Sequence, residues 1–184
     1  MWFELGGVQV AVESALDFSQ SYELVEGSAD VTLMSGRTVR QVWYRKLRTT
    51  LSFTGWWPAG LDGLDFRAPL TLLCAAPRQI QSPTVTVTLP PDRRTDAGYT
   101  PQGYAIVRGQ SRQVGGGDLV PTPLTLAGDV ATLTAVDGAI GYEVAYWPAL
   151  TVFAHVDSMD SDIGGATHRR TLTATTVERW PWQA

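Results

Sequence analysis

The amino-acid sequence predicts an all-β protein: a β-sandwich or barrel formed by both chain ends, with a β-rich insertion and at most one short helix. Two observations predict this fold class. Runs in which apolar and polar residues alternate recur along the chain of 184 residues, and turn-forming glycines lie between them. Because successive side chains of a strand point to opposite faces, this period of two is typical of half-buried strands. The apolar fraction of 44% and the charged fraction of 17% are those of a folded globular protein.

The clearest strand lies in LRTTLSFTGW, residues 47–56. Its buried face would carry Leu47, Thr49, Leu51 and Phe53, with polar residues between them on the other face. Similar runs predict further strands in ADVTLM (29–34), PTVTVTLP (83–90), DVATLTAV (129–136), GYEVAYW (141–147) and RTLTATTVERW (170–180). Turns are predicted at Glu26-Gly27, Ser35-Gly36, Asp137-Gly138, Gly164-Gly165 and the triple glycine at 115–117.

A short helix is predicted only after Pro58. Proline is favoured at the first helical position, and Leu61 and Leu64 lie three residues apart, so they would share one face of the helix. Gly60 and Gly63 lower the helix propensity, so this element should be short and should depend on packing.

The middle third of the chain differs in composition from its flanks. Residues 82–141 contain six prolines, the triple glycine and the polar stretch DRRTDAGYTPQG, whereas the flanks carry most of the tryptophans. We therefore predict that residues 1–81 and 142–184 form one core β-domain and that residues 82–141 form a β-rich insertion.

Charge and cysteine content argue against several function classes. The net charge is −4 and no segment clusters lysine and arginine, which argues against specific binding of nucleic acid. Cys74 is the only cysteine, and its apolar surroundings favour a buried core residue over a reactive thiol. No run approaches the roughly 20 apolar residues of a membrane span, and no signal-peptide pattern begins the chain. We therefore expect a protein that folds in the cytoplasm and does not bind membranes.

No catalytic or cofactor-binding residues are predicted. His155 and His168 lack the neighbours of a metalloprotease or triad motif, and the glycines at 115–117 lack the lysine of a phosphate-binding loop. The strongest chemical candidate is the aspartate group in HVDSMDSDIGG: Asp157, Asp160 and Asp162. Their spacing fits no EF-hand, so we favour a solvated loop between two strands, while a bound cation stays open as the alternative. We predict that the protein is not an enzyme and has no metal or cofactor.

Two segments resemble minor tail proteins of long-tailed bacteriophages (siphophage type), particularly those near the distal tail and the tail-tip hub. The first, residues 25–75, contains strands at 29–34, 39–44 and 47–53, followed by GWWPAGLDGLDFRAPL. The second, residues 142–178, is similar to the closing hairpin of these proteins, in which a tyrosine-rich strand turns at a proline, runs out as LTVFAHVD and returns to an acidic residue. The two segments cover about half of the chain and leave out the insertion.

The resemblance implies a structural component of a phage tail tip, a distal-tail-like ring protein that joins the tail tube to the hub or baseplate and lines the DNA conduit. The implied partners are copies of the same chain in a ring, six-fold or alternatively three-fold, together with the tail tube protein and tail hub proteins. DNA would pass through the lumen without specific binding. The implied location is the virion, after assembly in the host cytoplasm. Because the insertion is short, the departure from larger distal tail proteins argues against direct receptor binding.

Tryptophans are the expected contacts of such a ring, because they bury a large area at little cost in rotamer entropy. Trp56 and Trp57 are adjacent, so in an extended chain one could enter the core while the other meets a neighbouring subunit. Burial of both in the core is the alternative. The predicted interface candidates are Trp56, Trp57, Leu61, Leu64 and Trp147. Surface tryptophans would also suit a carbohydrate-binding β-sandwich module involved in host-surface attachment, which is the alternative function.

Overall fold

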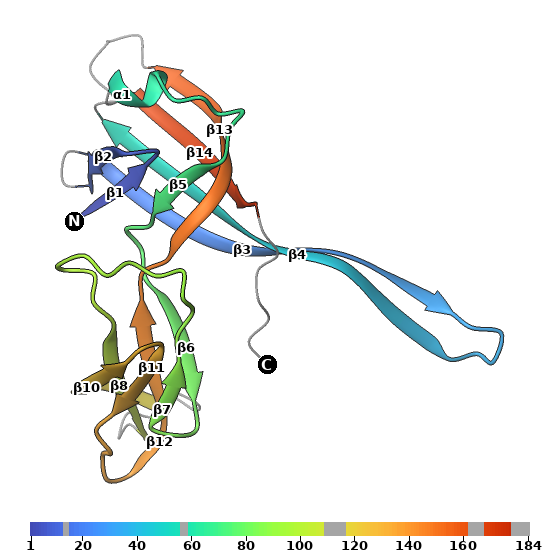
Figure 1. Ribbon diagram of the computed structural model, residues 1–184, viewed down its shortest axis with the longest axis vertical. Helices are drawn as coiled ribbons and strands as arrows, with labels where there is room; N and C mark the ends of the chain where they lie inside the picture. The colour runs from blue at the N-terminus through green and yellow to red at the C-terminus, as the bar shows by residue number, and fades with distance from the viewer. Residues whose placement is uncertain (13–14, 56–58, 109–116, 162–167, 178–184) are drawn as a thin grey trace. The chain divides into compact units, whose positions relative to one another are not determined.

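The computed structural model of the chain describes residues 1–12, 15–55, 59–108, 117–161 and 168–177 (Figure 1). These residues form fourteen β-strands and one helix of four residues, which confirms the predicted all-β fold class. The chain divides into two compact units, one of residues 1–75 with 150–184 and one of residues 76–149. In the described ranges, no helix is long and apolar enough to cross a membrane.

The first unit is built on one seven-stranded sheet, to which both ends of the chain contribute strands. The strand order is β2-β1-β5-β13-β14-β4-β3, and the β13–β14, β14–β4 and β4–β3 pairs are antiparallel. The strands are β1 (Trp2–Leu5), β2 (Val8–Ala11), β3 (Ala15–Thr32), β4 (Thr38–Gly55), β5 (Leu70–Leu73), β13 (Ala149–Ser161) and β14 (His168–Thr176). The C-terminal strands β13 and β14 therefore lie inside the sheet, between β5 and β4.

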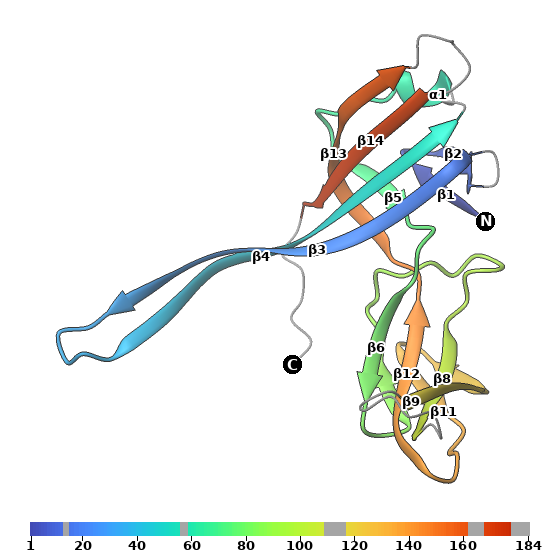
Figure 2. The ribbon, with the colours of Figure 1, turned by 180° about the vertical axis from the view of Figure 1, so that it is seen from behind.

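This sheet curls around its own core. Phe3 of β1 stacks on Phe18 of β3, with 5.8 Å between the ring centroids, although the two strands stand near opposite ends of the strand order. Phe53 of β4 lies 5.9 Å from Phe3 and extends the same aromatic cluster. Figure 2 shows the layer of β14, β4 and β3 from behind, with β1 and β5 on its other side. The first unit is thus a partly closed barrel.

Strand β4 has the alternation that the sequence predicts. On its core-facing side, relative exposure is 3% or less for Leu47, Thr49, Leu51 and Phe53. The polar member of this face, Thr49, is satisfied by hydrogen bonds to β3: its hydroxyl donates to the Ser21 carbonyl at 2.9 Å and accepts from the Gln20 side-chain amide at 3.1 Å. A buried hydroxyl with both bonds made costs little stability, so the threonine does not interrupt the core.

The described helix, α1 (Ala59–Asp62), begins directly after Pro58, where the sequence predicts it. Its single turn is held by Leu61, which is completely buried in the core of the first unit. Leu64 follows the helix and packs against the same core. Packing, rather than helix propensity, therefore stabilises this element.

The second unit is a small β-sandwich of two sheets. One sheet has the strand order β6-β12-β8-β9 and the other has the order β10-β11-β7. The strands are β6 (Arg78–Ser82), β7 (Thr86–Thr88), β8 (Gln102–Arg108), β9 (Gly117–Thr122), β10 (Leu124–Ala127), β11 (Val130–Leu133) and β12 (Ala139–Tyr146). Val87 and Leu133 from one sheet share a core with Val144 and Tyr146 from the other, so the two sheets bury one another's inner faces.

The second unit is larger than the insertion that composition predicts at 82–141. Strand β6 pairs with β12 from Ser82↔Tyr142 to Arg78↔Tyr146. Residues 76–81 and 142–149 therefore belong to this unit and not to the core β-domain. Composition places the boundary too far inside because β12 is as apolar as the flanks and β6, RQIQS, contains none of the prolines and glycines that mark the insertion.

A buried arginine orders the polar stretch DRRTDAGYTPQG (92–103) of the second unit. The Arg94 side chain is inaccessible and donates two hydrogen bonds to Asp96, at 3.0 Å from Nε and 2.6 Å from Nη2. Its guanidinium lies 3.3 Å from the centroid of the Tyr99 ring, and that ring meets Trp147 edge-on at 5.7 Å. The hydrogen bond from Arg94 holds the pKa of the Asp96 carboxyl below its ordinary value. This polar stretch is thus fixed by a specific ion pair and aromatic contacts.

Candidate assembly surface

Two of the predicted interface candidates are buried within their own unit. Leu61 has no exposed surface, and Trp147 retains 7% of its surface and packs on Tyr99. Both side chains pack within their own unit in this structure, and an interface role for them stays a prediction. Leu64 is partly buried against the core. Trp56 and Trp57 lie outside the described residues.

The predicted aspartate loop begins later than expected, because β13 continues to Ser161 and pairs with β14. Asp157 lies within the strand, where its carboxylate accepts a hydrogen bond from Thr173 and contacts Nε2 of His155 at 2.5 Å. Asp160 is also a strand residue, opposite Arg169, and Asp162 lies outside the described residues. Among the residues that the structure describes, no group of three His, Cys, Asp or Glu side chains could hold a metal ion.

The most prominent exposed feature is a long hairpin of β3 and β4. Strand β14 pairs with β4 only as far as the pair Thr175↔Arg48, and the last core-facing pair of the hairpin is Leu24↔Leu47. We call residues 25–46, beyond these pairs, the arm; Figure 1 shows it extending away from the sheet. Residues 25–32 alone span roughly 25 Å at about 3.3 Å per strand residue. The arm ends in the predicted Ser35-Gly36 turn, in which Gly36 has a φ of 78° and donates to the Leu33 carbonyl at 2.8 Å.

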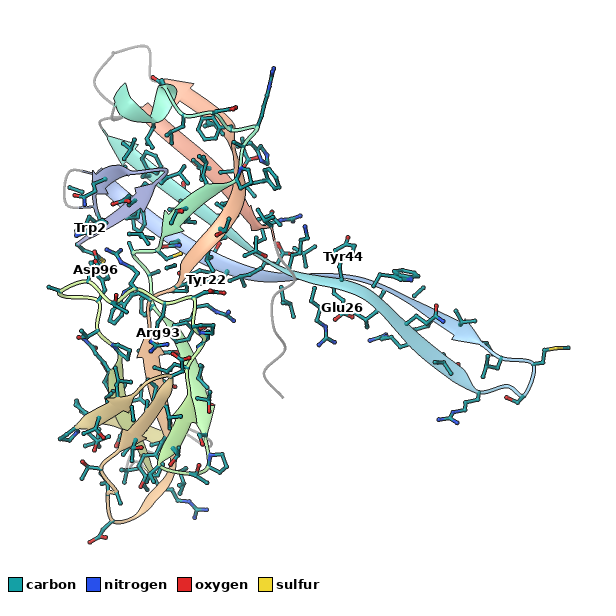
Figure 3. All side chains as sticks on the ribbon, viewed as in Figure 1. Trp2, Tyr22, Glu26, Tyr44, Arg93 and Asp96 are labelled. Carbon is teal, nitrogen blue, oxygen red and sulfur yellow. The ribbon has the colours of Figure 1, made fainter. Side chains whose placement is uncertain are left out.

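The arm has one polar and one apolar face. Residues directly opposite each other in a hairpin share a face, and successive pairs alternate between the faces. The polar face consists of the pairs Glu26↔Arg45, Ser28↔Val42, Asp30↔Arg40 and Thr32↔Thr38. The apolar face consists of the pairs Val25↔Lys46, Gly27↔Tyr44, Ala29↔Gln41 and Val31↔Val39. Figure 3 shows Glu26 and Tyr44 on opposite sides of the ribbon.

The polarity of the two faces reverses where the arm leaves the core. Leu24 and Leu47 lie on the core-facing side, and the next pair on that side is Glu26↔Arg45. The apolar residues of the arm therefore occupy the side that is polar near the core, where Glu23 pairs with Arg48. A hairpin that only extended the core would keep its apolar residues on the core-facing side. The reversal therefore indicates that the apolar face of the arm is a second contact surface, separate from the core.

Exposed apolar side chains are concentrated on this hairpin. Seven of the fourteen large hydrophobic residues that are exposed in the described ranges lie between residues 24 and 44: Leu24, Val31, Leu33, Met34, Val39, Trp43 and Tyr44. Met34 at the turn is completely exposed, and Trp43 is 61% exposed. Contiguous exposed apolar residues on a folded protein mark interaction sites.

Gly27 and Trp43 shape the middle of the arm. The register shifts between Gly27 and Ser28, which leaves Trp43 as an extra residue between Val42 and Tyr44 in a β-bulge. A Cβ atom at Gly27 would overlap the Tyr44 ring, which lies across the glycine. The sequence prediction of a turn at Glu26-Gly27 is therefore wrong: glycine is needed here because an aromatic ring covers the backbone, as in other strands that pair glycine with an aromatic residue.

Charge is divided between the two strands of the hairpin. Every charged residue of β3 is acidic, Asp17, Glu23, Glu26 and Asp30, and every charged residue of β4 is basic, Arg40, Arg45, Lys46 and Arg48. Arg40 binds Asp30 with two hydrogen bonds, 2.8 Å from Nε and 3.0 Å from Nη2, and Arg45 pairs with Glu26. The hydrogen bonds from Arg40 lower the pKa of the Asp30 carboxyl. These cross-strand pairs fix the register of the arm and keep its polar face close to neutral.

Comparison with known proteins does not assign the chain to a family. No protein-family model matches it, and no curated protein sequence is significantly similar to it.

Proposed function

We propose that the protein is a structural component of a bacteriophage tail tip: a distal-tail-like ring protein that joins the tail tube to the hub or baseplate and lines the DNA conduit. The observation that carries the proposal is the arm, an exposed amphipathic hairpin on a partly closed barrel. It lies in residues 25–46, within the first segment that resembles distal tail proteins.

The physical support is that an isolated two-stranded hairpin is only marginally stable in water, so a projecting arm of this kind gains order from a partner. Its apolar face and bulge are built with specific contacts, such as the Tyr44 ring over Gly27, rather than with the glycine- and serine-rich composition of a flexible loop. A subunit that assembles with copies of itself and with tube and hub proteins needs such a surface.

The partners in this proposal are further copies of the chain in a closed ring, six-fold or alternatively three-fold, and the tail tube and hub proteins. A closed ring uses heterologous contacts, in which two different surfaces of each subunit meet. DNA would pass through without specific binding, because a conduit that held phosphates would retard its passage. The paired charges on the polar face of the arm suit this role, since Asp30 and Glu26 offset Arg40 and Arg45.

The test is the presence and position of the protein in virions of the phage that encodes it. Mass spectrometry of purified particles should detect the chain in the copy number of a single ring per tail, six or alternatively three. Antibody labelling should place it at the tail tip. A nonsense mutation in its gene should yield tails that are incomplete at that end. Its absence from purified particles would refute the proposal.

A carbohydrate-binding module for host-surface attachment is the second candidate. The observation that favours it is Trp43, whose exposed ring beside Tyr44 could stack against a sugar. Glycan-array binding by the isolated chain that disappears in Trp43→Ala, with assembly into virions unchanged, would select this function over the ring role.

A further inference from the structure

Both edges of the arm lack a strand partner within the described part of the chain. Strand β3 is the last strand of the sheet, and among the described strands none pairs with its outer edge along the arm, residues 25–32. Among the described strands, β4 pairs only with β3 between residues 38 and 46. An edge strand of this length with no proline presents a row of backbone donors and acceptors to another strand.

The division of charge between the strands determines which edges can meet. If the β3 edges of two copies met, acidic residues would lie beside acidic residues, and two β4 edges would bring arginines together. Opposite charges across a strand pair are favourable and like charges are unfavourable. Pairing of β3 in one copy with β4 in the next places Asp30 and Glu26 beside Arg40 and Arg45.

We propose that the arm pairs edge to edge with the arm of a second copy of the chain, β3 of one copy antiparallel to β4 of the next. This inference rests on the proposed ring and identifies the surface that would form it. Because β3 and β4 are antiparallel within each hairpin, this arrangement keeps all arms pointing in the same direction, as a ring about one axis requires.

The preferred register places Asp30 opposite Arg40 of the next copy, and Ala29 opposite Gln41. The polar face then becomes a continuous row in which acidic and basic residues alternate from strand to strand. The apolar face likewise becomes continuous, because Val31 of one copy lies beside Val39 of the next. Each arginine keeps its partner within the hairpin and gains a second carboxylate from the neighbouring arm.

A charge-swapped variant tests the pairing while it preserves each hairpin. The variant carries Glu26→Arg, Asp30→Arg, Arg40→Asp and Arg45→Glu, so each cross-strand pair stays oppositely charged but both edges change sign. Wild-type and swapped full-length chains with different tags are mixed at high concentration and the composition of the oligomers is measured. We expect each form to assemble with itself and mixed contacts to be depleted about tenfold, since two favourable charge contacts become unfavourable.

Other outcomes of this mixing experiment would overturn the inference. Random mixing would show that the arm charges do not meet at the contact. Enrichment of mixed oligomers would show β3-to-β3 or β4-to-β4 pairing. A wild-type chain that stays monomeric at high concentration would exclude arm pairing as a contact that forms by itself. Circular dichroism of the swapped variant checks that it folds.

Two single-cysteine variants provide an independent measurement that changes no charge. Ala29→Cys and Gln41→Cys are oxidised separately and as a mixture; the native Cys74 is buried and should not react. Heterologous pairing predicts cross-linked dimers in the mixture and few in either variant alone. The reason is that residue 29 of one copy faces residue 41 of the next, so a disulfide between copies needs one copy of each variant. Dimers in one variant alone, or none in the mixture, would contradict the pairing. Absence of the protein from virions would refute the tail function without affecting either result.

Discussion

Changing Trp43 to alanine should separate assembly from folding. The Trp43 side chain is 61% exposed at the bulge of the arm, so its loss should change the free energy of unfolding by no more than about 0.5 kcal/mol. A tryptophan near the centre of an interface contributes about 2 kcal/mol or more to binding, which corresponds to roughly a 30-fold weaker association. We therefore expect a variant that melts like the wild type and assembles poorly.

The matched control is Leu51→Ala in the same strand. Leu51 is completely buried, and loss of a buried leucine side chain typically costs 2 to 5 kcal/mol, so this variant should unfold early. Urea unfolding measures stability in both variants, and sedimentation at several protein concentrations measures association. Early unfolding of Trp43→Ala, or unchanged association by it, would refute the reasoning.

Three further outcomes are expected from the remaining contacts. Gly27→Ala should loosen the arm by displacing the Tyr44 ring, which would be seen as faster amide exchange in residues 25–46. In a chain that carries Tyr44→Ala, adding Gly27→Ala should leave the exchange rates unchanged. Equal exchange in wild type and Gly27→Ala would contradict this. Asp96→Asn should destabilise the second unit by roughly 2 kcal/mol, less than for a fully buried pair because Asp96 is one-third exposed, as judged by urea unfolding; an unchanged midpoint would contradict it. The folded-state pKa of Asp96 is lowered, so the contribution of its carboxylate to the free energy of unfolding is complete above the ordinary carboxyl pKa of about 3.9 and is lost as pH falls through the lower folded value. Wild type should therefore lose more stability on acidification than Asp96→Asn. Parallel pH profiles of the two proteins would contradict this.

The sequence is informative where one face of a strand meets a core. The alternation of Leu47, Leu51 and Phe53 predicts the buried face of β4 because burial on one side imposes a period of two. It is less informative about what lies opposite a residue. The sequence predicts a turn at Gly27 because glycine is common in turns, whereas the structure requires glycine there because a ring from the facing strand covers the backbone.

Residues that could form an interface were difficult to identify for a related reason. Size and apolarity select both core and interface residues, so Leu61 and Trp147 could not be distinguished from exposed anchors without their tertiary contacts. A local signal for the arm does exist: the runs 29–34 and 39–44 flank the Ser-Gly turn, and their charges are opposite in sign. Combined with the alternation, that signal predicts a hairpin with oppositely charged strands, but not that it extends beyond the core.

The most direct test of the account is an electron cryo-microscopy map of the tail tip in intact virions. The account predicts a closed ring of this chain at the junction of tube and hub, with arms side by side and β3 of each copy against β4 of the next. A tail tip that lacks the chain would contradict the proposed function. A ring whose arms do not touch one another would contradict the proposed pairing.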